Sequence, residues 1–254
     1  MKASITTISK REIPIPPVSR SDVAFNAIAL VLNSSLTLWG MTWLILHWTE
    51  VDLPWYVLIE TIFLGLFLSD FFSGLLHWAF DTWFTENTPL LERMVLIVRE
   101  HHVYPQHIFR YQFHDEAGSV SWPSLAHTIP AIGLVTLRPG PVSVVGYCTV
   151  ILSVMVSVFT LFMLQFHKLG HRKSDSIIVR SLQRIHLLMS PQHHGQHHRG
   201  NHDIKYCLIN GWADFVMDSI GFWRGMEWII HWLTKAVPRS NDKIWLKRDR
   251  KRSS

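Results

Sequence analysis

Residues 186–202 read His-Leu-Leu-Met-Ser-Pro-Gln-His-His-Gly-Gln-His-His-Arg-Gly-Asn-His and contain six of the 16 histidines in the chain. On a helix, His194, His197 and His198 stand at positions i, i+3 and i+4, so their imidazoles project from one face. Histidine is the commonest protein metal ligand, and a bound metal removes the cost of crowding imidazoles that would otherwise take up protons. The spacing therefore predicts a metal-binding triplet.

The composition separates an apolar part, before residue 167, from a charged part after it. With 254 residues and 48% apolar content, the chain can bury a sizeable core or span a bilayer. The two cysteines, Cys148 and Cys207, give neither a disulfide framework nor a CxxC zinc site. The net charge of +5 fits a cytosolic face against anionic lipid and does not require a nucleic-acid partner.

Apolar runs predict an all-α integral membrane protein with about four transmembrane helices. The first run has no charge and is long enough to span, whereas the third is interrupted by Pro123 and Pro130. Several of the 12 tryptophans stand at the ends of these runs, where an aromatic belt would lie. The predicted spans are about 23–47, 54–80, 122–137 and 142–166.

An even number of spans places both termini and every histidine cluster on one side of the membrane. Arg138 is the only one of the 24 lysines and arginines on the other side, so the positive-inside rule makes the histidine-rich side cytoplasmic. We expect a flexible cytoplasmic arm at 1–22 and a histidine-rich di-metal cap at 167–210. An interfacial helix at 212–236 and a basic tail at 239–254 would follow.

Two carboxylates accompany a histidine on the second span. Asp70, His77 and Asp81 are separated by offsets of seven and four, which keep them on one helical face. An ionisable residue inside a span is costly and is a functional candidate by default. Asp70 lies about two turns below His77, so we expect it to orient or support the ligands and not to bind metal itself.

Two further patches fall on the same side of the membrane. Glu100-His101-His102 follows the second span, and His167 and His171 stand at i and i+4 where the last span ends. His193 flanks the opening triplet but points elsewhere on a helix. Whether His107, His114 and His186 take part is left open.

These patches supply more ligands than a zinc site needs, and no HExxH motif is present. Imidazole with carboxylate suits iron, and two octahedral ions with open positions could be held. A di-iron centre can activate dioxygen and remove hydrogen from an unactivated C–H bond, which no side chain does alone. The candidate ligands are His77, Asp81, His101, His102, His167, His171, His194, His197 and His198.

Several segments together resemble the Kua family of membrane lipid desaturases, which includes plasmanylethanolamine desaturases, a myxobacterial relative in light signalling and a plant plastid palmitate desaturase. The resemblance runs from about Asp70 to Arg239. It rests on Asp-Phe-Phe-Ser-Gly-Leu-Leu-His-Trp-Ala-Phe-Asp (70–81), Glu-His-His-Val-Tyr-Pro (100–105), Gln-Phe-His-Lys-Leu-Gly-His (165–171) and Gln-His-His-Gly-Gln-His-His-Arg (192–199).

The resemblance implies a lipid desaturase domain over 23–238 that uses two iron ions, dioxygen and electrons from cytochrome b5 or from ferredoxin with its reductase. It implies that His202 and Asp81 lie in or near the metal shell. Asp70, Glu100 and His193 would stand just outside it, with Asp115 as a further partner that orients imidazoles. The implied catalytic ligands are His77, His101, His102, His167, His171, His194, His197 and His198.

Departures from the family pattern cluster at 104–117. Tyr104 replaces an aspartate of the ether-lipid members, Tyr111 stands where they have a histidine, and His107 and His114 are additional. The expected activity is formation of a plasmalogen vinyl ether from a plasmanyl ether lipid. An acyl-lipid desaturase of the plastid type and an iron-dependent lipid hydroxylase remain alternatives. A haem- or metal-binding membrane protein without enzymatic activity and a metal transporter are further alternatives.

The topology fits a bacterial inner membrane and the endoplasmic reticulum equally well.

Overall fold

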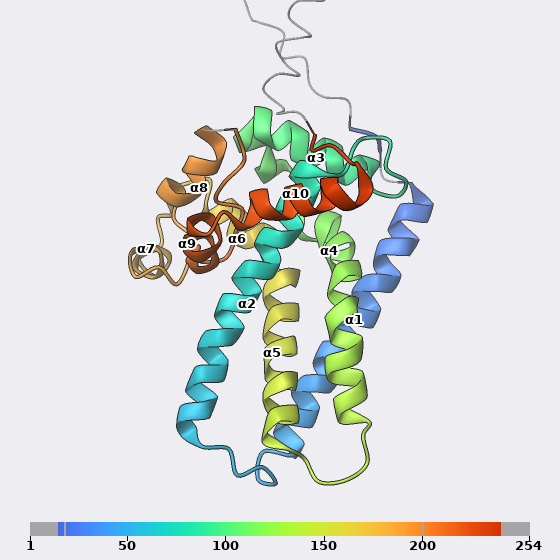
Figure 1. The fold of residues 1–254 in the computed structure, drawn as a ribbon, viewed down its shortest axis with the longest axis vertical. Coiled ribbons are helices and arrows are strands. Elements are labelled where there is room, and N and C mark those ends of the chain that lie inside the picture. Colours follow the sequence, from blue (N-terminus) through green and yellow to red (C-terminus); the bar gives the residue numbers. More distant parts are fainter. Residues whose placement is uncertain (1–14, 18, 200, 240–254) are drawn as a thin grey trace, which may run out of the picture.

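The computed structural model describes residues 15–17, 19–199 and 201–239, and the regular elements of this part of the chain are all helical. Long helices form a bundle, and short helices form a cap at one end of it (Figure 1). Among the described residues, three helices are long and apolar enough to cross a membrane: α1 (Arg20–Leu46), α2 (Trp55–Thr82) and α5 (Val144–Leu161). The chain is therefore an all-α membrane protein, as its sequence predicts.

The first helix begins inside the segment expected to be a flexible arm. Ser19 caps α1 by accepting from the Asp22 main-chain N–H at 3.0 Å, and the Asp22 carboxylate faces the Ser19 N–H in return. This capping box starts the helix at Arg20, before the apolar run. Residues 1–14 of the expected arm and 240–254 of the expected tail lie outside the described residues.

The segment predicted as a span at 122–137 belongs to a longer helical stretch that begins in a polar sequence. It consists of α4 (Phe113–Thr128) and the π-helix η2 (Ile129–Leu134). Pro130 lacks an N–H, which interrupts the regular hydrogen-bond ladder where the π-helix begins. This stretch is not among the three membrane-competent helices, so a count of four spans stays a prediction.

A buried polar cluster nevertheless ties this stretch to two of the long helices. Asn33 of α1 donates to the Ser157 hydroxyl of α5 at 3.0 Å and accepts from Thr128 of α4 at 3.2 Å. All three side chains are buried, and such bonds are the usual links between helices in lipid. The start of α4 lies close to α1 as well, because the backbone of Gly118 meets Asn26. α4 is thus an integral part of the bundle.

Two predicted helices are each divided. The run expected at 142–166 is split at Phe162 into α5 and α6 (Met163–Leu169), and the helix expected at 212–236 is split at Gly221. Gly221 has φ 65°, a conformation that glycine adopts without strain and that turns the chain from α9 (Trp212–Ser219) into α10 (Phe222–Thr234).

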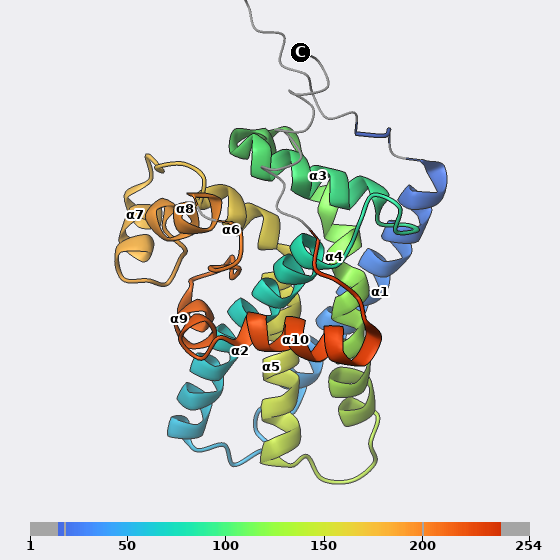
Figure 2. The ribbon, with the colours of Figure 1, turned by 45° about the horizontal axis from the view of Figure 1, so that its top comes forward.

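Helix α10 lies across the bundle beside the cap (Figure 2). Its Trp223 is buried against α2, whereas Trp228 and Trp232 are 67% and 62% exposed. One face is thus packed and the other is apolar and open, which suits the membrane interface. The remaining cap helices are α3 (Glu92–Val103), the 3-10 helix η1 (Pro105–Arg110), α7 (Ile177–Arg184) and α8 (Pro191–Arg199).

Candidate metal centre

The histidine patches predicted from spacing converge within the cap, where several helices end together. α2, α3, α6 and α8 each contribute one or more imidazoles to a common region. They form two groups in which one ligand atom per residue lies within 4.8 Å of every other. Group one contains His101, His167, His171, His194 and His198, and group two contains His77, Asp81, His102 and His197.

Group one is made of imidazoles whose Nε2 atoms face one another. The His167 Nε2 lies 2.8 Å from that of His194 and 3.1 Å from that of His101. The His194 Nε2 is also 3.0 Å from that of His198. A ring nitrogen is either a donor or an acceptor, so these converging atoms can satisfy one another only in part.

Group two is centred on a buried carboxylate. Asp81 Oδ2 lies 3.3 Å from the His197 Nε2 and 3.5 Å from the His77 Nε2, while Asp81 Oδ1 lies 3.5 Å from the His102 Nε2. The four side chains are buried. The two groups lie next to one another, because the consecutive residues His101 and His102 belong to different groups.

The donor atoms fit metal ions better than they fit one another. The buried Nε2 atoms of His77 and His171 have no hydrogen-bond partner, and such orphans are costly. A cation at the centre of each group would satisfy these lone pairs together. Five imidazoles in one group, and three imidazoles with a carboxylate in the other, can therefore hold two metal ions.

Two main-chain carbonyls set which ring nitrogen faces the groups. The Nδ1–H of His77 donates to the Tyr206 carbonyl and the Nδ1–H of His197 donates to the Ile204 carbonyl, each at 2.8 Å. A carbonyl only accepts, so the proton must be on Nδ1 and the Nε2 lone pair is left for a metal. Sequence reasoning missed both carbonyls.

Burial keeps these imidazoles in the form that binds metal. It lowers the pKa values of His101, His102, His167 and His194 well below 6.5, and neighbouring imidazoles lower them further. Burial and the nearby rings of His77 and His197 also lower the pKa of His171, to about 3. Neutral imidazoles at neutral pH bind a metal without first releasing a proton.

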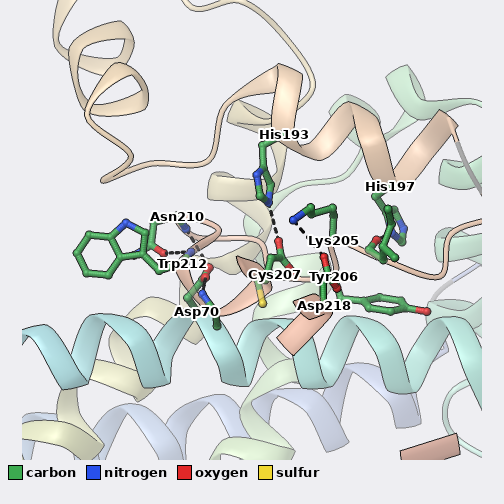
Figure 3. A network of polar contacts seen from close by, with 12 residues as sticks. Asp70, His193, His197, Lys205, Tyr206, Cys207, Asn210, Trp212 and Asp218 are labelled. Atoms are coloured by element: carbon green, nitrogen blue, oxygen red, sulfur yellow. Dashed lines mark hydrogen bonds and ion pairs between the residues drawn. The ribbon is translucent and has the colours of Figure 1, made fainter. Parts of the chain in front are cut away.

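Asp70 holds the segment that carries one of these carbonyls. Its fully buried carboxylate accepts from the main-chain N–H groups of Ile209, Asn210 and Ala213 at 2.9–3.0 Å (Figure 3). The partners are main-chain groups, not imidazoles. Asp70 therefore acts on the site through the loop that brings Tyr206 to His77.

His193 and Glu100 were expected beside the ligands, and the structure gives each a different set of partners. His193 Nε2 lies 2.7 Å from Asp214, which also accepts from the Cys207 N–H (Figure 3). Glu100 accepts from the Tyr111 hydroxyl at 2.5 Å and from the His107 Nδ1 at 2.9 Å. These contacts join α8 to α9 and α3 to η1.

The remaining candidate histidines lie around the two groups. The His202 ring stacks on that of His102 with centroids 4.1 Å apart, although His202 belongs to neither group. His186 is exposed. The side chains of His114 and Asp115 lie outside the described part of the structure.

The fold and the two groups define a membrane protein whose helical cap contains two clusters of side chains that could hold metal ions. The chain belongs to the family of proteins with a lipid desaturase domain, which matches residues 66–241. This match confirms the resemblance drawn from the four histidine-containing segments.

Curated relatives come from bacteria, animals and plants. The plasmanylethanolamine desaturase of Myxococcus xanthus is 34% identical over 74% of this chain and 65% of its own length. Plasmanylethanolamine desaturase 1 of Mus musculus is 30% identical over 71% of this chain and 68% of its own. The chloroplastic fatty acid desaturase 4 of Arabidopsis thaliana is 28% identical over 69% of this chain and 52% of its own length. The chain thus spans somewhat less than two thirds of the bacterial relative, and no solved structure matches it.

Proposed function

We propose that the protein is an oxygen-dependent membrane desaturase that holds two iron ions and converts a plasmanyl ether lipid into the vinyl ether of a plasmalogen. The observation that carries this proposal is the contact between the metal groups and an apolar cavity. The cavity is lined by apolar side chains of α2, α3 and α6 and by three imidazoles: His77, His101 and His167. The cavity has a volume of about 50 Å³, so it would admit only a short stretch of a lipid chain, whose C–H bonds would lie directly beside the metal ligands.

The residues of each group would act together as the ligands of one iron ion. The five imidazoles of group one and the three imidazoles and Asp81 of group two would each bind one ion. Bound iron would supply the activation of dioxygen and the removal of hydrogen from a C–H bond. The apolar walls would exclude water from the reacting carbons, and the Tyr206 and Ile204 carbonyls would keep the Nε2 atoms of His77 and His197 aimed inward.

Electrons from a donor such as cytochrome b5 or ferredoxin would complete the reaction, because reduction of dioxygen to water takes more electrons than one C–C desaturation releases. The donor would approach from the cytoplasm, since the proposed topology places the cap and both termini there. That topology rests on the position of Arg138 and fits a bacterial inner membrane or the endoplasmic reticulum.

The direct test measures metal and product together. Purified protein should contain about two iron ions per chain, and cells that express it should gain plasmalogens at the expense of plasmanyl lipids. A product two hydrogens lighter than its substrate supports desaturation, whereas a product one oxygen heavier would show a lipid hydroxylase. A Soret band would show a haem protein, and uptake of metal into vesicles without lipid change would show a transporter.

An acyl-lipid desaturase is the second candidate. It is favoured by the relation to fatty acid desaturase 4 and by the segment after α3, where Tyr111 bonds to Glu100 and replaces a histidine of the ether-lipid members. An alkene in an ester-linked chain, with plasmalogens absent, would establish this alternative.

A further inference from the structure

Helix α7 presents an outward face of large apolar side chains. Ile177, Ile178 and Ile185, at its two ends, are 63%, 68% and 60% exposed. At a turn of about 100° per residue, these three side chains fall within a sector of about 100° around the helix. We call this sector the isoleucine face. A contiguous apolar face of this kind is costly in water, so a partner is expected to cover it.

The opposite side of α7 is fixed to the protein. Gln183 is buried and lies about 190° around the helix from the centre of the isoleucine face. Its Nε2 donates to the Leu169 carbonyl at 3.2 Å and to the Met189 carbonyl at 3.0 Å. These bonds tie α7 both to the end of α6 and to the segment before α8. The isoleucine face therefore points away from the protein and cannot turn inward without breaking both bonds.

The position of α7 along the bundle corresponds to the depth of the membrane on the cap side. Figure 1 shows α7 and α9 on the same side of the bundle and at a similar height, below α8. The Ala213 N–H at the start of α9 donates to Asp70 of α2 at 3.0 Å. Asp70 stands 15 residues after Trp55, where α2 begins, which corresponds to about 22 Å of helix. A hydrocarbon layer about 30 Å thick that begins near Trp55 therefore reaches the level of α9.

Cations border the isoleucine face. Lys173, in the loop before α7, and Arg184, in its last turn, are exposed and line a cavity of about 500 Å³ between α7 and the start of α8. Arg184 lies about 20° from Ile177 around the helix, so its guanidinium stands at the edge of the apolar face. Arg180 lines the same cavity, but its guanidinium already donates to two main-chain carbonyls. Residues 172–186 include four lysines and arginines and one aspartate, so this region is positively charged.

We propose that α7 lies on the membrane surface, with its isoleucine face in the leaflet beside the cap and with Lys173 and Arg184 at the phosphates of anionic lipids. A helix whose apolar face is bordered by cations suits this position, because the apolar side chains leave water while the cations stay among the headgroups. α9 exposes Phe215 and Ile220, which extends the apolar surface at this level. The inference depends neither on bound iron nor on desaturation.

An acidic soluble protein is the competing occupant of this surface. Such a protein could pair with Lys173 and Arg184, and an electron donor of this charge would suit the proposed reaction. It would also need a matching apolar patch for the three isoleucines, and it would have to reach them at the depth of the lipid. The isoleucine face and the level of α7 therefore favour the lipid surface.

A nitroxide label on the full-length protein in lipid nanodiscs would measure the depth of α7. The label would be attached at Ile178→Cys in a Cys148→Ser background, since the native Cys207 is fully buried and protected from labelling. Oxygen concentrates in hydrocarbon and a nickel chelate stays in water, so collisions of the label with these two reagents report its depth. We expect oxygen collisions to dominate at residue 178 and nickel collisions to dominate at the control Gln196→Cys, which is exposed on α8.

A label at residue 178 that collides mainly with the nickel chelate would overturn the proposal. If an added acidic protein, such as the soluble domain of a cytochrome b5, then shielded that label, the surface would belong to a protein partner instead.

The role of the cations would be tested by changing the lipid. Replacing part of the phosphatidylcholine in the nanodiscs with phosphatidylserine should raise the ratio of oxygen to nickel collisions at residue 178, because the anionic headgroups attract Lys173 and Arg184. Lys173→Gln with Arg184→Gln should remove this rise. The matched control Arg20→Gln with Arg138→Gln takes away two exposed cations elsewhere and should keep it. A ratio that does not respond to phosphatidylserine in the wild-type protein, or a rise that persists without the two cations, would overturn the anionic-lipid contact.

Discussion

The Nδ1–H of His77 donates to the main-chain carbonyl of Tyr206, 2.8 Å away and 129 residues later in the chain. The bond fixes the tautomer of an imidazole at the end of α2 and at the same time anchors the segment between α8 and α9. Metal binding by His77 would therefore be coupled to the tertiary structure of the cap through this contact. Two of the predictions that follow disturb that segment without touching a ligand.

Asp70→Asn should loosen the segment from α2. The carboxylate accepts three main-chain N–H bonds, and an amide would turn its NH2 group toward at least one of these donors. We expect a loss of about 1–3 kcal/mol in the free energy of unfolding and a lower iron content. Thermal unfolding in detergent and iron analysis measure both. Glu60→Gln, exposed on the same helix, is the control, and equal unfolding midpoints for the two variants would contradict the prediction.

Gly74→Ala should disturb the same segment by steric contact. A Cβ at this position would lie 2.5 Å from the Cys207 Sγ and 3.3 Å from its Cα, so Cys207 and the neighbouring Tyr206 carbonyl would have to move. We expect reduced iron content with the long helices intact by circular dichroism. Gly225→Ala, where nothing lies within 4 Å, should bind iron normally. Full iron occupancy in Gly74→Ala would show that the carbonyl position is not needed.

Alanine substitutions should separate ligands from neighbouring histidines. His171→Ala, His194→Ala and His198→Ala each remove a member of group one and should abolish desaturation while the protein still inserts in the membrane. Their iron content should fall by about half or more, from the proposed two per chain. His193→Ala removes a bond to Asp214, so its iron should stay near the wild-type value while its unfolding temperature falls. Full activity in any of the three group-one variants would reject the ligand assignment.

Acid should destabilise the metal-free protein. The pKa values of His101, His102, His167 and His194 lie well below 6.5 in the folded chain, and unfolded histidines titrate near 6.5. Below pH 6.5 the unfolded form therefore binds more protons, and the free energy of unfolding decreases as the pH falls. The slope is about 1.4 kcal/mol per pH unit for each fully shifted imidazole.

Denaturant titrations of metal-free protein between pH 8 and 5 would measure this slope. The His194→Ala variant has one buried imidazole fewer, so its stability should change less steeply with pH. A stability that is independent of pH across this range would show that the imidazoles are already protonated or exposed in the absence of metal.

The local spacing of the histidines, together with that of Asp81 one turn after His77, was sufficient to predict which residues form the two groups. His194, His197 and His198 share a face of one helix, and His167 and His171 stand one turn apart, so each patch is recognisable by itself. Their division into two groups was not predictable, because it depends on how α2, α3, α6 and α8 are rotated against one another. His101 and His102 illustrate this, since adjacent residues belong to different groups.

The bounds of the helices were less predictable where a segment of polar sequence is nevertheless packed inside the helical bundle. The polar segment 113–121 gave no apolar signal, yet it forms the first half of α4, because Ala117 and Val120 are buried in the bundle. The partners of His193 and Glu100 were likewise hidden, since Asp214 and Tyr111 reach them only through the tertiary fold. The main-chain carbonyls of Ile204 and Tyr206 have no side-chain signature at all.

The last turn of α3 contributes one candidate metal ligand to each of the two groups. His101 and His102 leave the same helical turn about 100° apart, so the geometry of this one helix contributes to how far and in which direction the two groups are separated. A change that unwinds this turn would shift both positions at once, however well the other ligands are held. The distance between the two proposed ions would therefore respond to the local geometry of two consecutive residues, His101 and His102.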